Sequence, residues 1–425
     1  MIIWQIAENC PAGKAGSAEA PPAVRVAAMT KQPAELTINS RLRLLRNPIL
    51  LAVVTLFWTS LYTYPSILSP YLKDLGASLT ATGLVISSYG LTQTILRIPA
   101  GILSDRLRNK RSFVIAGMIL SLLSAAGLFF SQDIWLILLF RGLAGAAAAM
   151  WVHISTLYMS YHSADKAAEA LGKLSFCNNA GSMAAMLAGS AVAQLWGWKY
   201  AFLLAVVIAV PGLALSLAVQ EDKPDAASQT APLQLRDILA IGRDRTLFWT
   251  AVLALLSQLV NFATTQGFVP QFASNLGATK AQLGLLSAFA LLPRALAALL
   301  GGNFLARWFK LRYLVIFGFV LTSAATCALP LINNLPLLFA DQFVSGVGSG
   351  FQITLLMAMC TQTIPLNRKA SAMGFFQAVY GIGMVVGPTL IGLLADWFSL
   401  GTGFVIIGLV SLLTAGLTAL VLRVD

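Results

Sequence analysis

Long runs of apolar residues recur along the chain from Pro48 to Leu422, and short polar or charged stretches separate them. Several of these runs exceed the roughly 18 residues that mark a membrane-spanning helix. A membrane β-barrel would instead show segments of about ten residues in which apolar and polar positions alternate. The pattern therefore predicts an all-α polytopic membrane protein.

The limits of the apolar runs predict twelve transmembrane helices in two sets of six. The first set lies near residues 49–72, 80–103, 112–130, 134–158, 168–194 and 200–219, and the second near 247–273, 280–305, 313–332, 336–362, 370–395 and 402–422. We therefore expect a disordered, basic N-terminal tail at 1–47, a six-helix bundle at 48–219, a cytoplasmic linker at 220–245 and a second six-helix bundle at 246–425. Within the tail, Met29 is a second candidate for the start of the natural chain.

The basic residues predict which side of the membrane each loop faces. If the N-terminus is cytoplasmic, 22 of the 28 Lys and Arg residues lie on the cytoplasmic side, and only Lys73, Lys199 and Lys280 lie outside. This bias is the usual one for inner loops, so both termini are expected in the cytoplasm. The net charge of +12 then reflects topology rather than nucleic-acid binding, and we expect a multi-pass protein of the cell membrane.

The two halves of the chain resemble each other. At a shift of 201 residues, the segment "DLGASLTATGL" from Asp74 aligns with "NLGATKAQLGL" from Asn275, and Gly145 aligns with Gly346. With one more residue inserted, Gly181 meets Gly383. Two copies in the same orientation form a parallel repeat, which is typical of alternating-access transporters with a binding site between the halves.

The loop between the second and third predicted helices, "GILSDRLRNKR", resembles the loop motif of the major facilitator superfamily. The matching residues are Gly101, Leu103, Asp105, Arg106, Lys110 and Arg111. In that superfamily the acid of the motif holds the cytoplasmic side shut in the outward-facing state, so the resemblance implies that Asp105 is a gate residue. Gly101 is expected where helices approach closely, and the bases are expected at the anionic inner leaflet. The second copy, "GNFLARWFKLR", has Ala306 in place of the acid.

Four ionisable residues lie clearly inside predicted helices, namely Arg97, Arg141, Arg294 and Asp341. A charged side chain at a helix centre costs about 2.5–3.5 kcal/mol on insertion, so each is a functional candidate. Arg97 lies near the inner face of the membrane, where its long side chain can reach the interface. Its position can therefore be explained without a functional role. Arg141 and Gly145 resemble the R-x-x-x-G motif that is linked with proton coupling in antiporters of the superfamily.

In the superfamily fold the fourth and tenth helices line the cavity, so Arg141 and Asp341 are expected to face each other across it, with Gln342 beside the acid. The alternative is that Asp341 lies near the outer end of its helix and is simply hydrated there. Arg294 is expected to suit an anionic substrate, because guanidinium geometry matches carboxylates and phosphates. Its alternative is a structural role at helix ends.

Other polar and aromatic residues complete the expected pocket, since small-molecule sites combine apolar walls with a few polar groups. Gln258, Asn261 and Thr265 are spaced to share one helix face, and the remaining candidates are Tyr62, Asn178, Gln377 and Tyr380. Gly383, Gly387 and Pro388 resemble the GxxxGP element of superfamily antiporters, but they lie in the eleventh helix rather than the fifth. They are expected to mark a flexible, closely packed helix.

The sequence favours a secondary active transporter, with proton coupling expected, over other membrane proteins. The only histidines, His153 and His162, have no metal or nucleophile partner at suitable spacing, and no phosphate-binding loop is present, so neither a metal, a cofactor nor ATP hydrolysis is expected. Uptake of a small organic anion by a monomer is the first interpretation. Efflux of amphipathic compounds or metabolites is the alternative, and a membrane enzyme is a distant one.

Overall fold

The computed structural model describes residues 33–107, 109–162, 166–221, 241–362, 364–365 and 368–422. Apart from the first turns of α2, the features described below lie in the unit Arg46–Asp425. Most of the sequence-predicted linker, 220–245, and most of the predicted tail lie outside the described residues.

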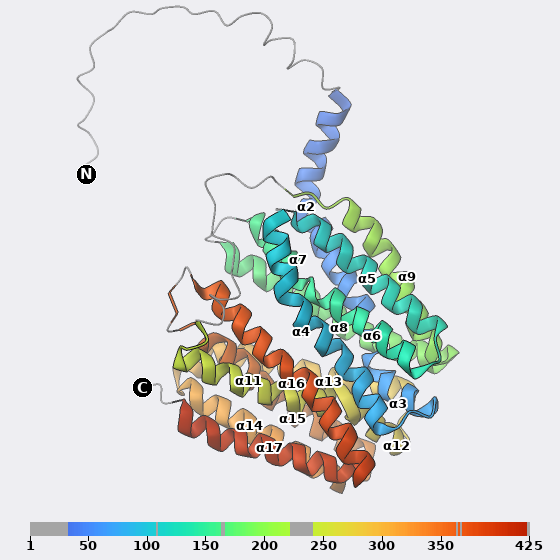
Figure 1. The fold of residues 1–425 in the computed structure, drawn as a ribbon, viewed down its shortest axis with the longest axis vertical. Helices are drawn as coiled ribbons and strands as arrows, with labels where there is room; N and C mark the ends of the chain where they lie inside the picture. The colour runs from blue at the N-terminus through green and yellow to red at the C-terminus, as the bar shows by residue number, and fades with distance from the viewer. Residues whose placement is uncertain are drawn as a thin grey trace, which may run out of the picture. The chain divides into compact units, whose positions relative to one another are not determined.

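All described secondary-structure elements are helices, as the apolar pattern predicts (Figure 1). In the first half these are α2 (Pro33–Tyr62), α3 (Pro65–Asp74), α4 (Leu79–Leu107), α5 (Lys110–Phe130), α6 (Ile134–Ala149), α7 (Trp151–Ser160), α8 (Ala167–Trp196) and α9 (Trp198–Leu217). In the second half they are α11 (Arg245–Ala263), the π-helical η2 (Thr264–Phe268), α12 (Val269–Asn275), α13 (Lys280–Asn303), η3 (Leu305–Arg307), α14 (Leu311–Ala328), η4 (Leu329–Leu331), α15 (Leu335–Met359), α16 (Lys369–Trp397) and α17 (Leu400–Val421).

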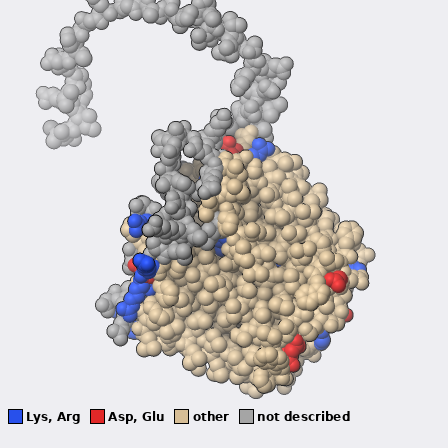
Figure 2. Space-filling model, in the orientation of Figure 1, with Lys and Arg blue, Asp and Glu red and all other residues tan. Residues whose placement is uncertain are grey.

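Nine helical segments among the described residues are long and apolar enough to cross a membrane. The helices α4, α8 and α15, which match the predicted second, fifth and tenth spans, are not among these nine. Large apolar side chains such as Phe130 and Leu413 are 81% and 74% exposed, as expected for a lipid-facing surface. Figure 2 shows a broad face without charged side chains and places the visible Lys, Arg, Asp and Glu residues near its margins.

Polar residues between the apolar runs begin several of these helices. The Asp133 carboxylate accepts hydrogen bonds from the backbone N–H groups of Trp135 and Leu136, which lie in the first turn of α6. Such N-caps satisfy donors that a helix start leaves unpaired. Two turns that precede α4 and α13 contain Gly76 and Gly277, whose φ angles of 83° and 88° favour glycine. Since these glycines are 201 residues apart, the repeat extends to backbone conformation.

The first and seventh predicted spans are both broken at the same place in the repeat. The break between α2 and α3 lies at Thr63 and Tyr64, and Pro65, which lacks a backbone N–H, begins α3. In the second half α11 ends at Ala263 and is followed by the π-helical η2. Interruptions of this kind are frequent at functional sites in helices.

The two halves pack against each other along α4 with α16 and along α8 with α13 (Figure 1). Small residues permit this approach: a Cβ added at Gly83 of α4 would lie 2.2 Å from the carbonyl oxygen of Pro388 in α16. A Cβ added at Gly284 of α13 would lie 2.7 Å from the carbonyl oxygen of Met186 in α8. These two interfaces are equivalent in the repeat.

At the predicted outer end, two equivalent contacts join the halves. The Asp396 carboxylate of α16 accepts hydrogen bonds from the backbone N–H groups of Leu79, at 3.1 Å, and Thr80, at 2.8 Å, at the start of α4. The Gln194 side chain of α8 accepts one from the backbone N–H of Lys280, at 2.9 Å, at the start of α13. A side chain from each half therefore caps a helix of the other half.

Further contacts between α3 and α12 close the same end. The Ser69 hydroxyl donates to the Gln271 side-chain oxygen at 2.8 Å, and both residues are buried. The Lys73 ammonium group donates to the Asn275 side-chain oxygen at 2.6 Å. The structure is therefore closed at the predicted outer end.

Candidate functional site

Arg141 of α6 lies buried between two tyrosines and is only 6% exposed. Its Nη1 donates a hydrogen bond to the Tyr64 hydroxyl at 3.4 Å. The guanidinium carbon lies 4.4 Å from the centre of the Tyr89 ring and 5.3 Å from that of Tyr64, so both contacts are cation–π interactions. Its Nε is buried and has no hydrogen-bond partner.

The small residues after Arg141 bring Tyr89 to it. A Cβ at Gly145 would lie 2.1 Å from the Tyr89 carbonyl oxygen, so only glycine allows α6 and α4 to pack this closely. The Thr92 hydroxyl donates to the Gly142 carbonyl oxygen at 2.6 Å and joins the same two helices. Tyr89 is a site residue that the sequence analysis did not select, although Tyr89, Gln93 and Arg97 share one face of the helix at i, i+4 and i+8.

A second arginine, Arg294 of α13, lies near the same aromatic groups from the other half. Its electrostatic neighbours are Tyr62 and Tyr380, and those of Tyr62 include Arg141, Arg294 and Tyr89. Both Arg294 and Tyr62 are half-buried. One tyrosine of α2 therefore lies within electrostatic range of an arginine from each half.

Neither Arg141 nor Arg294 forms a salt bridge with an Asp or Glu among the residues that the structure describes. Arg97 of α4 donates from Nη1 to the Tyr380 hydroxyl of α16 at 3.2 Å, which links the two halves beside the cluster. Three cations and several phenol groups thus occupy this region. A bound anion would supply the missing counter-charge, because buried cations are costly unless they are paired.

Asp341 does not face Arg141 in this structure, contrary to the expectation from the sequence. Its Oδ2 accepts a hydrogen bond from Gln342 Nε2 at 3.0 Å, and Gln342 Oε1 accepts one from the Thr265 hydroxyl at 3.1 Å. Adjacent helical residues point about 100° apart. Because Gln342 points toward η2, the neighbouring Asp341 points toward α14 instead of the arginines.

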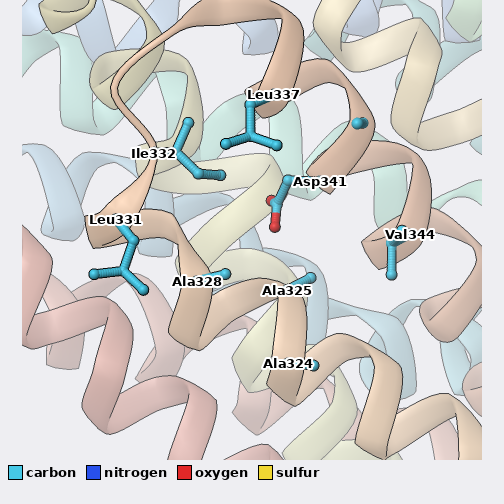
Figure 3. Close-up of a pocket in the computed structure, with 9 residues that line it drawn as sticks. Ala324, Ala325, Ala328, Leu331, Ile332, Leu337, Asp341 and Val344 are labelled. Atoms are coloured by element: carbon cyan, nitrogen blue, oxygen red, sulfur yellow. The ribbon is translucent and has the colours of Figure 1, made fainter.

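The Asp341 carboxyl group lines a pocket of about 340 Å³ between α14, η4 and α15 (Figure 3). The other lining residues are all apolar, namely Ala324, Ala325, Ala328, Leu331, Ile332, Leu337, Ala340 and Val344. Asp341 itself is 9% exposed. This pocket is separate from the arginine cluster and combines one acid with an apolar wall.

Of the polar residues expected on one face of the seventh span, two lie in α11 and the third lies in η2. Gln258 and Asn261 are buried in α11, and Asn261 Nδ2 lies 3.5 Å from Gln258 Oε1. Thr265 lies beyond the end of α11 in the π-helical η2, and its hydroxyl contacts Gln342. A shared face of these three residues therefore stays a prediction.

The remaining pocket candidates are half-buried residues of α8 and α16. Asn178 accepts a hydrogen bond from the Ser182 hydroxyl at 3.4 Å. Tyr380 lies 5.7 Å from Phe376, measured between ring centres, and Gln377 lies one turn before it on α16. Each is partly accessible, so all three remain candidate wall residues.

The gate motif is described only in part, because the side chains of Asp105 and Arg106 lie outside the described set. A Cβ at Gly101 would meet no atom of the described residues within 4 Å, so these residues do not show the close approach expected at this glycine. Lys110 begins α5. Arg111 donates from Nη2 to the Leu217 carbonyl oxygen at 2.6 Å, so it contacts the end of α9.

The glycines of α16 contact α11 closely. A Cβ at Gly383 would lie 2.1 Å from the Leu255 carbonyl oxygen, and one at Gly387 would lie 2.2 Å from that of Leu259. Pro388 lies inside α16, where it removes a backbone donor. This helix packs against both α11 and α4 and therefore connects the wall of the site to the interface between the halves.

The family model of the Major Facilitator Superfamily matches residues 50–272 and 251–425, which include nearly all of the helical region. The chain belongs to the major facilitator superfamily. It is 26% identical over 384 residues to the gentisate transporter of Corynebacterium glutamicum, an alignment that covers 86% of this chain and 84% of the relative. It is 22% identical over 337 residues to a multi-drug resistance efflux pump PmrA homolog of Lactococcus lactis, covering 77% of this chain and 83% of that protein.

Among solved structures, the fold is similar to a bacterial homolog of the human lysosomal transporter Spinster in an inward-facing and occupied conformation. The TM-score is 0.75 at 16% identity, and the match covers 93% of this chain and 98% of that chain. This likeness shows the fold alone. As a member of the major facilitator superfamily, the protein is a membrane-embedded, multi-pass transporter of small solutes.

Proposed function

We propose that this superfamily member carries a small organic anion through a cavity lined by Arg141 and Arg294. The observation that supports the proposal is the convergence of both arginines, one from each half, on Tyr62. Guanidinium groups recognise carboxylates through paired hydrogen bonds. Since each half contributes one cation, a bound anion would bridge the parts that move in alternating access.

An aromatic carboxylate is the preferred substrate class. The rings of Trp58 and Tyr62 lie 5.6 Å apart between their centres, and those of Trp58 and Trp151 lie 5.4 Å apart. The indole Nε1 of Trp58 is buried without a hydrogen-bond partner. Aromatic groups next to the cations suit a flat anion, in agreement with the gentisate transporter among the relatives.

The experiment is counterflow of radiolabelled gentisate in proteoliposomes. Arg294→Ala should abolish exchange, whereas Arg294→Lys should retain part of it, because the lysine keeps the charge but not the paired geometry. Size-exclusion chromatography and thermal melting of each variant report whether it is folded. An unchanged rate in folded Arg294→Ala would contradict the anion assignment.

Proton coupling is the second part of the proposal, with Asp341 as the group that takes up and releases the proton. It is an acid buried inside α15, and Gln342, which donates to it, also accepts from the Thr265 hydroxyl and so connects it to η2 of the seventh span. Uptake by the wild type should increase when the external pH is lowered. Asp341→Asn should remove this pH dependence, and an unchanged dependence would exclude Asp341 as the coupling group.

Efflux of amphipathic compounds is a second candidate function, favoured by the apolar pocket around Asp341. A carboxyl group within an apolar wall suits a lipophilic cation, and one relative is named as a multi-drug efflux pump. Cells that express the protein should then accumulate less of a lipophilic cationic dye, and Asp341→Asn should restore accumulation. Equal dye levels with and without expression would reject this function.

A further inference from the structure

The start of α14 at the predicted inner end has a small basic pocket. Its volume is about 250 Å³, and Ala306, Lys310, Arg312 and Gln362 are among its lining residues. Arg312 Nη1 donates to the Leu422 carbonyl oxygen at 3.4 Å, while its Nε is buried and has no partner. The pocket therefore contains two cations and a donor that is not satisfied.

The repeat shows what occupies the equivalent place in the first half. Arg111, which is equivalent to Arg312, lies in the first turn of α5, and its backbone N–H donates to the Glu221 carboxylate at 2.8 Å. Asn109 caps the same helix by accepting from the Ser112 N–H at 3.0 Å. An anionic group is thus bound at the start of α5, where the helix dipole favours negative charge.

No described residue supplies such an anion at the start of α14. The residue before this helix, Lys310, makes no side-chain cap, and Ala306 stands where the first copy of the motif has Asp105. Both differences make the second copy more positive. Among the described residues, the second copy of the repeat therefore keeps the helix start and its bases without a neighbouring acid.

Exposed aromatic residues lie close in sequence to the pocket residues, and Phe309 is one of the lining residues. Phe304, Trp308, Phe309 and Tyr313 are 58%, 75%, 55% and 52% exposed. Aromatic side chains of this kind are enriched where a membrane meets water. The pocket therefore lies at the depth of lipid headgroups, next to the leaflet that attracts basic residues.

We propose that this pocket binds the phosphodiester headgroup of an anionic phospholipid through Lys310, Arg312 and the start of α14. The lipid phosphate takes the place that Glu221 has in the first half. The Ala306 side chain adds no opposing charge, and the exposed rings contact the acyl chains. The proposal concerns a lipid site outside the transport cavity and does not depend on the substrate.

The experiment measures thermal stabilisation of the purified full chain by phosphatidylglycerol and by phosphatidylcholine in mixed micelles. Phosphatidylglycerol should stabilise the wild type more. In Lys310→Gln/Arg312→Gln the concentration needed for half of the effect should rise roughly 30-fold, since two charges near the anionic lipid are lost. Arg368→Gln/Lys369→Gln removes two exposed charges at the same predicted end outside the pocket, and it should respond as the wild type does.

Two further arms separate the possible outcomes. Ala306→Asp keeps both bases but restores the acid of the motif, so it should also lose the preference for phosphatidylglycerol. Inorganic phosphate at equal concentration should have no effect. If phosphate alone stabilised the protein, the ligand would be a free anion and the lipid proposal would be wrong. An equal response of the wild type and the Lys310/Arg312 variant would overturn the proposal.

Discussion

In the first half, Arg141 of α6 bonds to the Tyr64 hydroxyl at 3.4 Å, and in the second half Gln342 of α15 bonds to the Thr265 hydroxyl at 3.1 Å. Each residue of the first pair is 201 positions before its counterpart. The same two spans of each half are therefore joined at the same point. The repeat preserves this contact while the chemistry of the side chains differs.

A third residue in each half explains why the first half has a buried arginine and the second half has a neutral glutamine at the equivalent position. Tyr89 has its ring against Arg141, but the equivalent residue in the second half is Ala290, which offers no π face. A buried cation is retained where aromatic rings stabilise it, and a neutral amide occupies the equivalent place where they are absent. The comparison shows that the two halves share their backbone packing but differ in the side-chain chemistry that could recognise a substrate.

The largest effect is expected where packing is shared. Gly145→Val and Gly346→Val should each destabilise the protein severely, because a Cβ would lie 2.1 Å from the Tyr89 carbonyl oxygen or 2.3 Å from that of Ala290. Overpacking costs about 1–3 kcal/mol and more where the backbone cannot move. Thermal melting in detergent is the measurement. Gly416→Ala, which has open space, is the control, and a loss confined to one glycine would break the symmetry of packing.

A smaller effect, confined to transport, is expected where the halves differ. Arg141→Gln makes the first half resemble the second, and the amide can still accept a hydrogen bond from Tyr64, so the variant should fold. Anion counterflow should fall roughly 30-fold or more, because loss of one partner of a buried charged pair costs about 2–5 kcal/mol. Gln342→Ala, tested in parallel, should reduce the rate far less. Equal losses in the two variants would contradict a special role for the cation.

The smallest effect is expected at the caps of the predicted outer end. Asp396→Asn should favour opening about two- to fivefold, since a charge at a helix start contributes about 0.3–1 kcal/mol. Gln194→Glu should shift the equilibrium the other way by adding such a charge. The rate of thiol modification of Ser69→Cys, with the native cysteines replaced, reports opening because Ser69 is 1% exposed. Identical rates in both variants would show that the caps do not hold this end closed.

The helices and the family could be predicted from the sequence because their signals are local and repeated. Apolar runs determine where each helix lies, and the motif from Gly101 to Arg111 together with the 201-residue shift indicates the superfamily. Side-chain direction was harder to predict. The sequence did not indicate the π-helical segment that contains Thr265, and Asp341 lines a separate pocket instead of facing Arg141.

Contacts between distant helices could not be derived from one sequence. Tyr89 and Arg141 are separated by a whole helical hairpin, and only the packing of α4 on α6 brings them together. The same limit explains Gly101, whose sequence context predicted a close neighbour that the structure does not show. Local pattern determines which residues are available, and tertiary packing determines which of them meet.

The breaks in the first and seventh spans lower the free energy that is needed to bend the transporter at these two positions. Continuous helices resist bending because each turn is tied to the next by hydrogen bonds, and kinks occur where that series is interrupted. Here the series of backbone hydrogen bonds is interrupted beside Tyr64, just before the short helix α3. It is interrupted again at η2, just before the short helix α12. We therefore expect α3 and α12 to tilt apart at these two breaks during transport, while the rings and arginines of the site keep their arrangement.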